Sequence, residues 1–153
     1  FEVRGYARTP RSIEGVATFA GSDRLAAFAD GLDIVVSVLP LTPETTGIMN
    51  AGFFGMLADG AFVINGGRGP QVDDDDLLAA LDSGKLGGAA LDVFAVEPLP
   101  QDHPFWTHPK VRVWPHVAAQ TNATSAAEQV AAAITAMMDG SEPANRVDWS
   151  RGY

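Results

Sequence analysis

The sequence contains no cysteine, which excludes a disulfide scaffold and a thiolate metal site. It is also poor in basic residues: 10 Lys and Arg stand against 19 Asp and Glu, for a formal net charge of −9. Nucleic acid and anionic membrane both require a basic face, so neither is expected as a partner. The expected partner is a small molecule.

Long apolar runs are missing as well. No stretch approaches the length of a membrane span, and no basic, apolar leader opens the chain, so we expect a cytoplasmic protein. There is no initiator methionine, and the chain begins on Phe1 in what reads as the middle of a strand. We therefore expect a fragment of a longer protein. Its 153 residues, 46% of them hydrophobic, suffice for one globular domain with a core.

Short apolar segments alternate with helical patterns along the chain. The expected strands are 1–7, 16–20, 34–39, 61–64, 87–93 and 111–114. Two expected helices follow Ser22 and Asn50 as capping residues, and a third runs from Asp73 to Leu81. A last helix to Met138 begins at an S-x-x-E box of Ser125 and Glu128. The run 34–39 is typical of a strand buried on both faces. This alternation predicts an α/β fold with a parallel sheet.

The stretch Phe62 to Asp76 combines an apolar run, a glycine-rich turn with one arginine, and four aspartates. We interpret Asp73–Asp76 as the start of a helix, where the peptide dipole favours negative charge. A metal site is not expected there, because a helix spreads neighbouring side chains by about 100 degrees. Arg68, in the turn, has a planar fork that pairs with a carboxylate. The turn therefore predicts an anion-binding site.

Ligands of parallel sheets bind beyond the carboxyl ends of the strands. The polar clusters of the sequence fall at such ends, at 8–9, 42–46, 65–69, 92–97 and 115–121. Arg68, Glu97 and His116 each follow a different expected strand. A carboxylate beside a histidine favours the protonated ring and keeps a proton available near neutral pH. Together the three residues predict an anion clamp beside an acid/base pair.

Each of these residues also has a structural explanation when it is considered alone. His116 follows a proline at a strand end and is compatible with a turn residue, and Glu97 with a solvated loop acid. Arg68 is compatible with a bridge to a surface carboxylate, and Asp92 with a local cap. The catalytic hypothesis therefore depends on the combination.

Several ordered strings carry a resemblance to a known family. They are VLPLTPET at 38–45, NGGRG at 65–69, DDDDLLAALDSGKLGGAALDVFAVEPLP at 73–100 and PHVAAQT at 115–121. They resemble the dinucleotide-binding half of the D-2-hydroxyacid dehydrogenases over nearly the whole chain. The turn ART at 7–9, LDVF with EPLP, and the closing RGY are most similar to the bacterial glyoxylate/hydroxypyruvate reductases of the A type.

The resemblance implies a Rossmann-like, doubly wound parallel sheet and a role for each candidate residue. Arg68 binds the substrate carboxylate and polarises its keto oxygen, His116 protonates that oxygen, and Glu97 sustains the charge of His116. Asp92 holds the nicotinamide carboxamide. The implied reaction is hydride transfer from a reduced nicotinamide to a small 2-oxo acid, glyoxylate or hydroxypyruvate.

The cofactor is expected to be NADPH in preference to NADH, with NAD still open. In a dinucleotide fold the second strand ends in an acid that holds the ribose 2′-hydroxyl, or in an arginine that accommodates a 2′-phosphate. Here that position has arginines and no acid. The implied cofactor-binding residues are Arg8, Thr9, Arg11, Leu39, Pro40, Thr45, Asn65, Gly66, Gly67 and Asp92.

The chain departs from the family at its start. The fingerprint G-x-G-x-x-G and the strand before it are absent, and 84–88 is no substitute because it precedes a strand. We expect a partial dinucleotide-binding domain at 1–140, without its central first strand, and a tail at 141–153 that returns to a substrate domain. Residues 1–153 alone are expected to show no turnover.

Two other functions stay open at this stage: an NAD-dependent phosphoglycerate dehydrogenase, and a non-enzymatic NAD(H)-sensing protein similar to a corepressor. The resemblance also implies a homodimer formed through this domain. The Pro-rich loop around Phe105 and Trp106 is the candidate contact, and we expect exposure or an interface role for His103 and His108. The choice of 2-oxo acid is left open.

Overall fold

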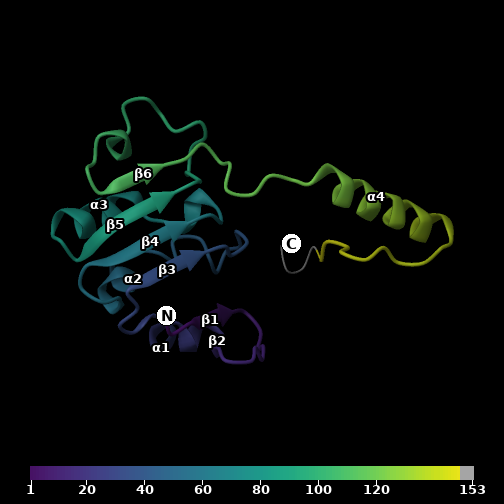
Figure 1. The fold of residues 1–153 in the computed structure, drawn as a ribbon, viewed down its shortest axis with the longest axis horizontal. Helices are drawn as coiled ribbons and strands as arrows, with labels where there is room; N and C mark the ends of the chain where they lie inside the picture. The colour runs from purple at the N-terminus through teal and green to yellow at the C-terminus, as the bar shows by residue number, and fades with distance from the viewer. Residues whose placement is uncertain (149–153) are drawn as a thin grey trace. The chain divides into compact units, whose positions relative to one another are not determined.

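The computed structural model describes residues 1–148 (Figure 1). Its strands are β1 Arg4–Ala7, β2 Ala17–Ala20, β3 Ile34–Ser37, β4 Ala61–Asn65, β5 Leu86–Leu91 and β6 Val111–Val113. Its α-helices are α1 Leu25–Ala29, α2 Ala51–Met56, α3 Asp74–Asp82 and α4 Ala123–Met138. Three 3-10 turns, η1 to η3, lie at Ser22–Arg24, Gly69–Gln71 and Pro104–Trp106. No helix within 1–148 is long and apolar enough to cross a membrane.

The chain divides into two compact units, Phe1–His116 and the part from Val117 onward. The first holds all the strands above, and the second holds α4. The domain limit expected at residue 140 stays a prediction. The closing RGY, at 151–153, lies outside the described residues.

All strand pairs within the named sheets are parallel, which confirms the predicted α/β class. One sheet has the order β3-β4-β5-β6, and β1 and β2 form a second, two-stranded sheet. In the Rossmann order 3-2-1-4-5-6, strand 1 lies between strands 2 and 4. Strand 2 corresponds to β1 of this chain, and strand 4 corresponds to β3. The division between the two sheets falls at that place.

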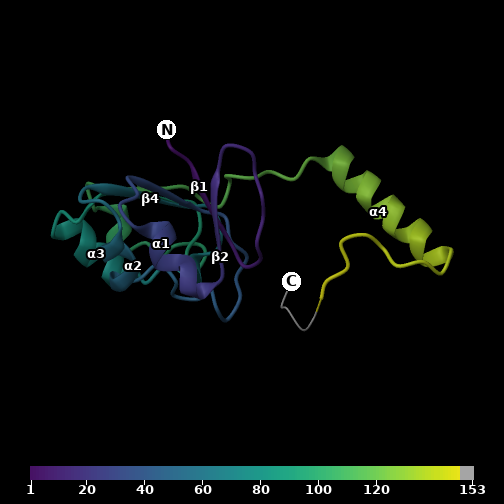
Figure 2. The same ribbon diagram turned by 90° about the horizontal axis from the view of Figure 1, so that it is seen from below.

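Helices α1, α2 and α3 lie on one side of the four-stranded sheet (Figure 2). Val35 and Val63 face the core on that side and are at most 5% exposed. Their neighbours point the other way, and Ile34 and Val36 are 44% and 57% exposed. The expected burial of 34–39 on both faces is therefore wrong: within this unit the described helices cover one face, so the strand alternates between buried and exposed residues.

The predicted helix starts are right at two positions and wrong at two. The side chain of Asn50 accepts a hydrogen bond from Phe53 N, and that of Asp73 accepts one from Asp76 N. Ser22 makes no side-chain cap, because the chain enters the 3-10 turn η1 from Gly21. The box at Ser125 is wrong because Asn122, an equally strong capping residue, already accepts from Ser125 N.

Helix α3 is held at both ends by contacts with other segments of its unit. At its start, Asp76 Oδ2 accepts from Ala51 N at 2.8 Å, and Asp74 lies 3.5 Å from His103 Nε2. Burial raises the pKa of Asp74, and the histidine opposes that rise. These contacts assign Asp74 and Asp76 to the start of α3 and its packing.

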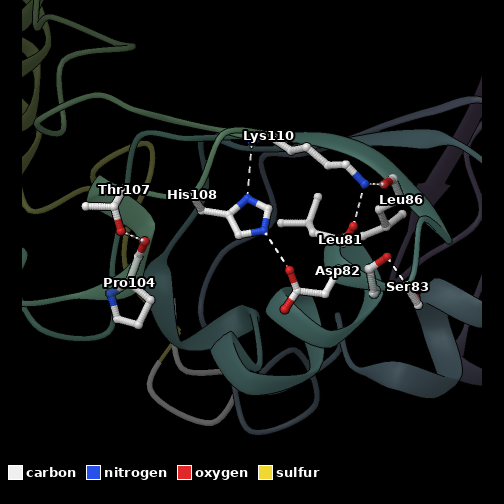
Figure 3. Close-up of polar contacts among 9 residues, drawn as sticks. Leu81, Asp82, Ser83, Leu86, Pro104, Thr107, His108 and Lys110 are labelled. Carbon is white, nitrogen blue, oxygen red and sulfur yellow. Dashed lines mark hydrogen bonds and ion pairs between the residues drawn. The ribbon is translucent and has the colours of Figure 1, made fainter.

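The C-terminal end of α3 is held by the loop before β6 (Figure 3). Lys110 Nζ donates to Leu81 O, where the helix dipole favours a cation. His108 Nδ1 accepts from Lys110 N, so its Nε2 carries the proton shared with Asp82 Oδ1 at 3.3 Å. The side chains of His103 and His108 are only 20% and 12% exposed, so the expectation of exposure is wrong for both.

Candidate active site

The carboxyl ends of β3 to β6 lie along one edge of the sheet, and main-chain hydrogen bonds continue past the strands into the loops. Gly66 N donates to Ser37 O, and Asp92 N donates to Asn65 O, both at 3.0 Å. His116 N donates to Asp92 O at 2.8 Å. The loops that carry the candidate residues are therefore joined directly to one another.

The predicted contact between His116 and Glu97 is formed, and its acid/base role stays a prediction. His116 Nδ1 lies 2.8 Å from Glu97 Oε2, and Phe94 N donates to Glu97 Oε1 at 2.9 Å. The hydrogen bond from His116 and then the one from Phe94 N hold the pKa of Glu97 below its ordinary value. An ionised carboxylate only accepts hydrogen bonds, so Nδ1 carries a proton and Nε2 is the ring nitrogen available for proton exchange.

His116 has a left-handed backbone, with φ of 56°. This conformation is uncommon outside glycine and costs about 1 kcal/mol or more. The hydrogen bond from His116 N to Asp92 O holds it in place. Local strain of this kind often occurs at functional sites, because the surrounding structure must fix the side chain in one direction.

Arg68 lies in a turn whose main chain is held by side-chain hydrogen bonds. Asn65, which is 1% exposed, accepts from Gly67 N at 3.0 Å and donates to Arg68 O at 3.1 Å. A Cβ on Gly67 would lie 2.5 Å from Gln71 Oε1, and one on Gly69 would lie 1.8 Å from the carbonyl carbon of Phe94. The turn therefore requires glycine at both positions.

The arginine side chain is exposed, and its Nη1 donates to Gly67 O at 2.6 Å. Its positive charge contributes to the lowered pKa of Glu97, after the two hydrogen bonds and the charge of His116. Arg68 and His116 thus both lie within electrostatic range of Glu97. A cation beside a histidine with an available Nε2 can bind an anion and deliver a proton to it.

An apolar pocket of about 350 Å³ adjoins the pair. Besides Glu97 and His116, it is lined by Phe94, Pro98, Leu99, Trp106, Val113 and Pro115. The side chains of His116 and Glu97 are themselves 50% and 36% exposed, so the pair lies at the solvent-accessible rim of this apolar wall.

One residue that sequence reasoning missed is Gln71. It is 0% exposed, its Oε1 accepts from Arg68 N at 3.1 Å, and its Nε2 donates to Leu39 O at 2.9 Å. The available signal was its position three residues after Arg68, in a Gly-Pro turn. At this spacing a glutamine side chain reaches back to the main chain before a helical turn.

The implied cofactor residues are brought together in part. Asn65, Gly66 and Gly67 form the Arg68 turn, and Asp92, 8% exposed, follows β5 beside it. Leu39 and Pro40 are tied to that turn through Gln71. Thr45 is used within its own loop, where its Oγ1 donates to Pro40 O and accepts from Thr42 N.

The two arginines that follow β1, Arg8 and Arg11, are exposed. The charge of Arg8 adds to the lowering of the Glu44 pKa, which comes mainly from a hydrogen bond with Thr42. This places Arg8 within electrostatic range of the 42–46 loop. Thr9 is also exposed, and Arg11 O accepts from Thr18 Oγ1 at 2.6 Å. This bond ties the main chain of Arg11 to β2.

Residues 1–118 match the family model described as D-isomer specific 2-hydroxyacid dehydrogenase, NAD binding domain, and the chain belongs to this family. A glyoxylate/hydroxypyruvate reductase A from Serratia proteamaculans is 50% identical over all 153 residues. Another, from Yersinia enterocolitica, is 48% identical over the same length. The chain spans about half the length of these curated relatives, 49% of each.

Solved structures agree with this assignment. A D-isomer specific 2-hydroxyacid dehydrogenase from Xanthobacter autotrophicus Py2, in complex with NADPH and MES, is 48% identical with a TM-score of 0.96. The match covers 100% of this chain and 63% of that one. An NADPH-dependent glyoxylate/hydroxypyruvate reductase from Sinorhizobium meliloti, in complex with NADP and sulfate, is 42% identical with a TM-score of 0.94, over 100% of this chain and 50% of that one.

The Glu97–His116 pair predicts a titration in the acid range. The lowered pKa of Glu97 means that the pair stabilises the fold above the unfolded pKa of about 4.3 and loses this effect as the pH falls through the folded value. Carboxyl NMR should give a Glu97 midpoint below the ordinary value of a solvated glutamate in the unmodified chain. In His116→Ala the midpoint should rise. His108→Ala is the control, and an equal rise in that variant would contradict the assignment.

Proposed function

We propose that the protein that contains this domain reduces a small 2-oxo acid, glyoxylate or hydroxypyruvate, to the corresponding 2-hydroxy acid, with NADPH as the reductant. The observation that carries the proposal is the 2.8 Å contact between His116 Nδ1 and Glu97, with the guanidinium of Arg68 in electrostatic range. Two relatives that are about half identical to this chain over its whole length are named glyoxylate/hydroxypyruvate reductase A. These names support the choice of substrates.

In the proposed reaction Arg68 binds the substrate carboxylate through its planar fork and polarises the keto oxygen. His116 donates the proton from Nε2 to that oxygen as it gains negative charge. Glu97 keeps the imidazole in one orientation and stabilises the charged ring before the transfer. The hydrogen bond from Phe94 N keeps Glu97 ionised and in place.

The chain's own residues fit a nicotinamide cofactor at this edge. Asp92 would hold the carboxamide, and the glycine turn at 66–67 allows a ring to approach the main chain closely. Leu39, Pro40 and Thr45 would line the cofactor's path, and Arg8, with Thr9 and Arg11, would receive the 2′-phosphate. When bound, NADPH supplies the hydride. The structures of relatives in complex with NADPH or NADP support this preference.

We also propose a homodimer formed through this domain. Of the two aromatic residues in the predicted contact, Phe105 is 1% exposed and belongs to the core. Trp106 is 51% exposed and is therefore the candidate for the contact. An exposed indole is a typical interface residue. Light scattering should give twice the monomer mass for the intact protein and a lower average mass for Trp106→Asp. An unchanged mass in that variant would exclude this loop from the contact.

The proposed roles predict large losses of activity. In the intact protein, His116→Ala and Arg68→Ala should each lower kcat/KM for glyoxylate by about 100-fold or more, because proton donation or carboxylate binding is lost. Arg68→Lys should recover only part of the loss, since an ammonium lacks the planar fork. His103→Ala, which removes the imidazole that lies 3.5 Å from Asp74, is the matched control. Wild-type rates in both alanine variants would refute the mechanism.

Cofactor choice is predicted to depend on Arg8. Arg8→Ala should lower kcat/KM for NADPH about tenfold, the effect of one charge-assisted contact, and leave that for NADH nearly unchanged. Arg24→Ala is a suitable control, because Arg24 is exposed and lies over the ring of Phe19. A wild-type preference for NADH, or indifference of NADPH to the change at Arg8, would contradict the expected cofactor.

A further inference from the structure

The side chain of Gln71 makes as many hydrogen bonds as its amide allows. Its Oε1 accepts from Arg68 N at 3.1 Å and from Ser37 Oγ at 3.2 Å. Its Nε2 donates to Leu39 O at 2.9 Å and to Pro40 O at 3.1 Å. Two accepted and two donated bonds exhaust a primary amide, and the two donors fix which end of the amide faces which loop.

The four bonds connect two different loops. The oxygen end contacts the turn after β4, which carries Arg68, and the end of β3 at Ser37. The nitrogen end contacts the Leu39–Pro40 turn after β3. Under the proposed function, the first turn binds the 2-oxo acid and the second lines the cofactor. The amide is thus a direct link between the two binding surfaces, buried at 0% exposure.

Glutamate, methionine and asparagine cannot make the same link. Glutamate has two acceptor oxygens and no donor when ionised, and methionine has the length but neither the donors nor a strong acceptor. Asparagine is one methylene shorter. The space is also closed, because a Cβ on Gly67 would lie 2.5 Å from Gln71 Oε1 and 2.9 Å from Leu39 O. The neighbouring glycine therefore allows the amide to lie against both loops.

We propose that Gln71 is a positioning residue that fixes the distance and orientation between the Arg68 turn and the cofactor-facing Leu39–Pro40 turn. This inference rests on the proposed function. It assigns Gln71 no contact with substrate or cofactor. Its effect is transmitted through Arg68 N on one side and through two main-chain carbonyls on the other.

Steady-state kinetics of the intact protein test the proposal. Gln71→Met should lower kcat/KM for glyoxylate by at least about tenfold, since a small displacement of a substrate-orienting group is costly. Gln71→Glu keeps the acceptors and loses both donors, so it should raise KM for NADPH more than KM for glyoxylate. It also serves as the second variant if Gln71→Met does not fold. Unchanged constants in a folded Gln71 variant would overturn the inference.

A core variant separates positioning from stability. Leu81 belongs to α3, is 0% exposed and is not part of the proposed site. Leu81→Ala should lower the melting temperature and leave both KM values within about twofold, because buried-cavity variants act mainly on stability. If Leu81→Ala changed the KM values as much as the Gln71 variants do, the effect would be one of stability and the inference would fail.

Hydrogen exchange followed by mass spectrometry gives a readout that needs no turnover. In Gln71→Met, peptides that cover Arg68 should exchange faster, and peptides that cover β5 should be unchanged. Equal exchange at Arg68 in the two proteins would overturn the inference even if the enzyme is active. If instead wild type reduces no 2-oxo acid while exchange at Arg68 still depends on Gln71, the proposed function fails and the structural link stands.

Discussion

The parallel alignment of β3 to β6 is the constraint on which the candidate site depends. Parallel strands direct all their carboxyl ends to one edge, and the register Ile64↔Ala90 and Ala90↔Arg112 keeps those ends level. Residues far apart in the sequence, at 68, 97 and 116, are thereby brought into one region. No single loop could supply a cation, a carboxylate and an imidazole in this arrangement.

The loops beyond the strands are held by main-chain groups as much as by side chains. Asn65 and Gln71 satisfy the peptide groups around Arg68, and Phe94 N fixes Glu97. Within 1–148 no buried side-chain nitrogen or oxygen is left without a hydrogen-bond partner. Polar groups in such a network have one favourable arrangement, because breaking any bond leaves a buried group unsatisfied. The charged groups are therefore presented from a rigid support.

Much of this organisation could be predicted from the sequence. The strands and the start of α3 follow local patterns, and the Glu97–His116 pair was predicted from its place after two strands and is formed at 2.8 Å. What failed depends on tertiary context. The exposure of Val36 depends on which elements cover a face of the sheet, and the choice between Asn122 and Ser125 as cap depends on where the chain first turns. Gln71 has no local signal for its contacts with Leu39 and Pro40, 32 and 31 residues away.

The two glycines of the Arg68 turn also limit how this protein can change. At Gly67 and Gly69 even a methyl group would collide with neighbouring atoms, mainly of the main chain. Mutational drift or directed evolution therefore cannot reshape this turn by adding side chains at these two positions. Changes in the shape of this surface must arise at other positions, while the turn that carries the arginine keeps its two glycines.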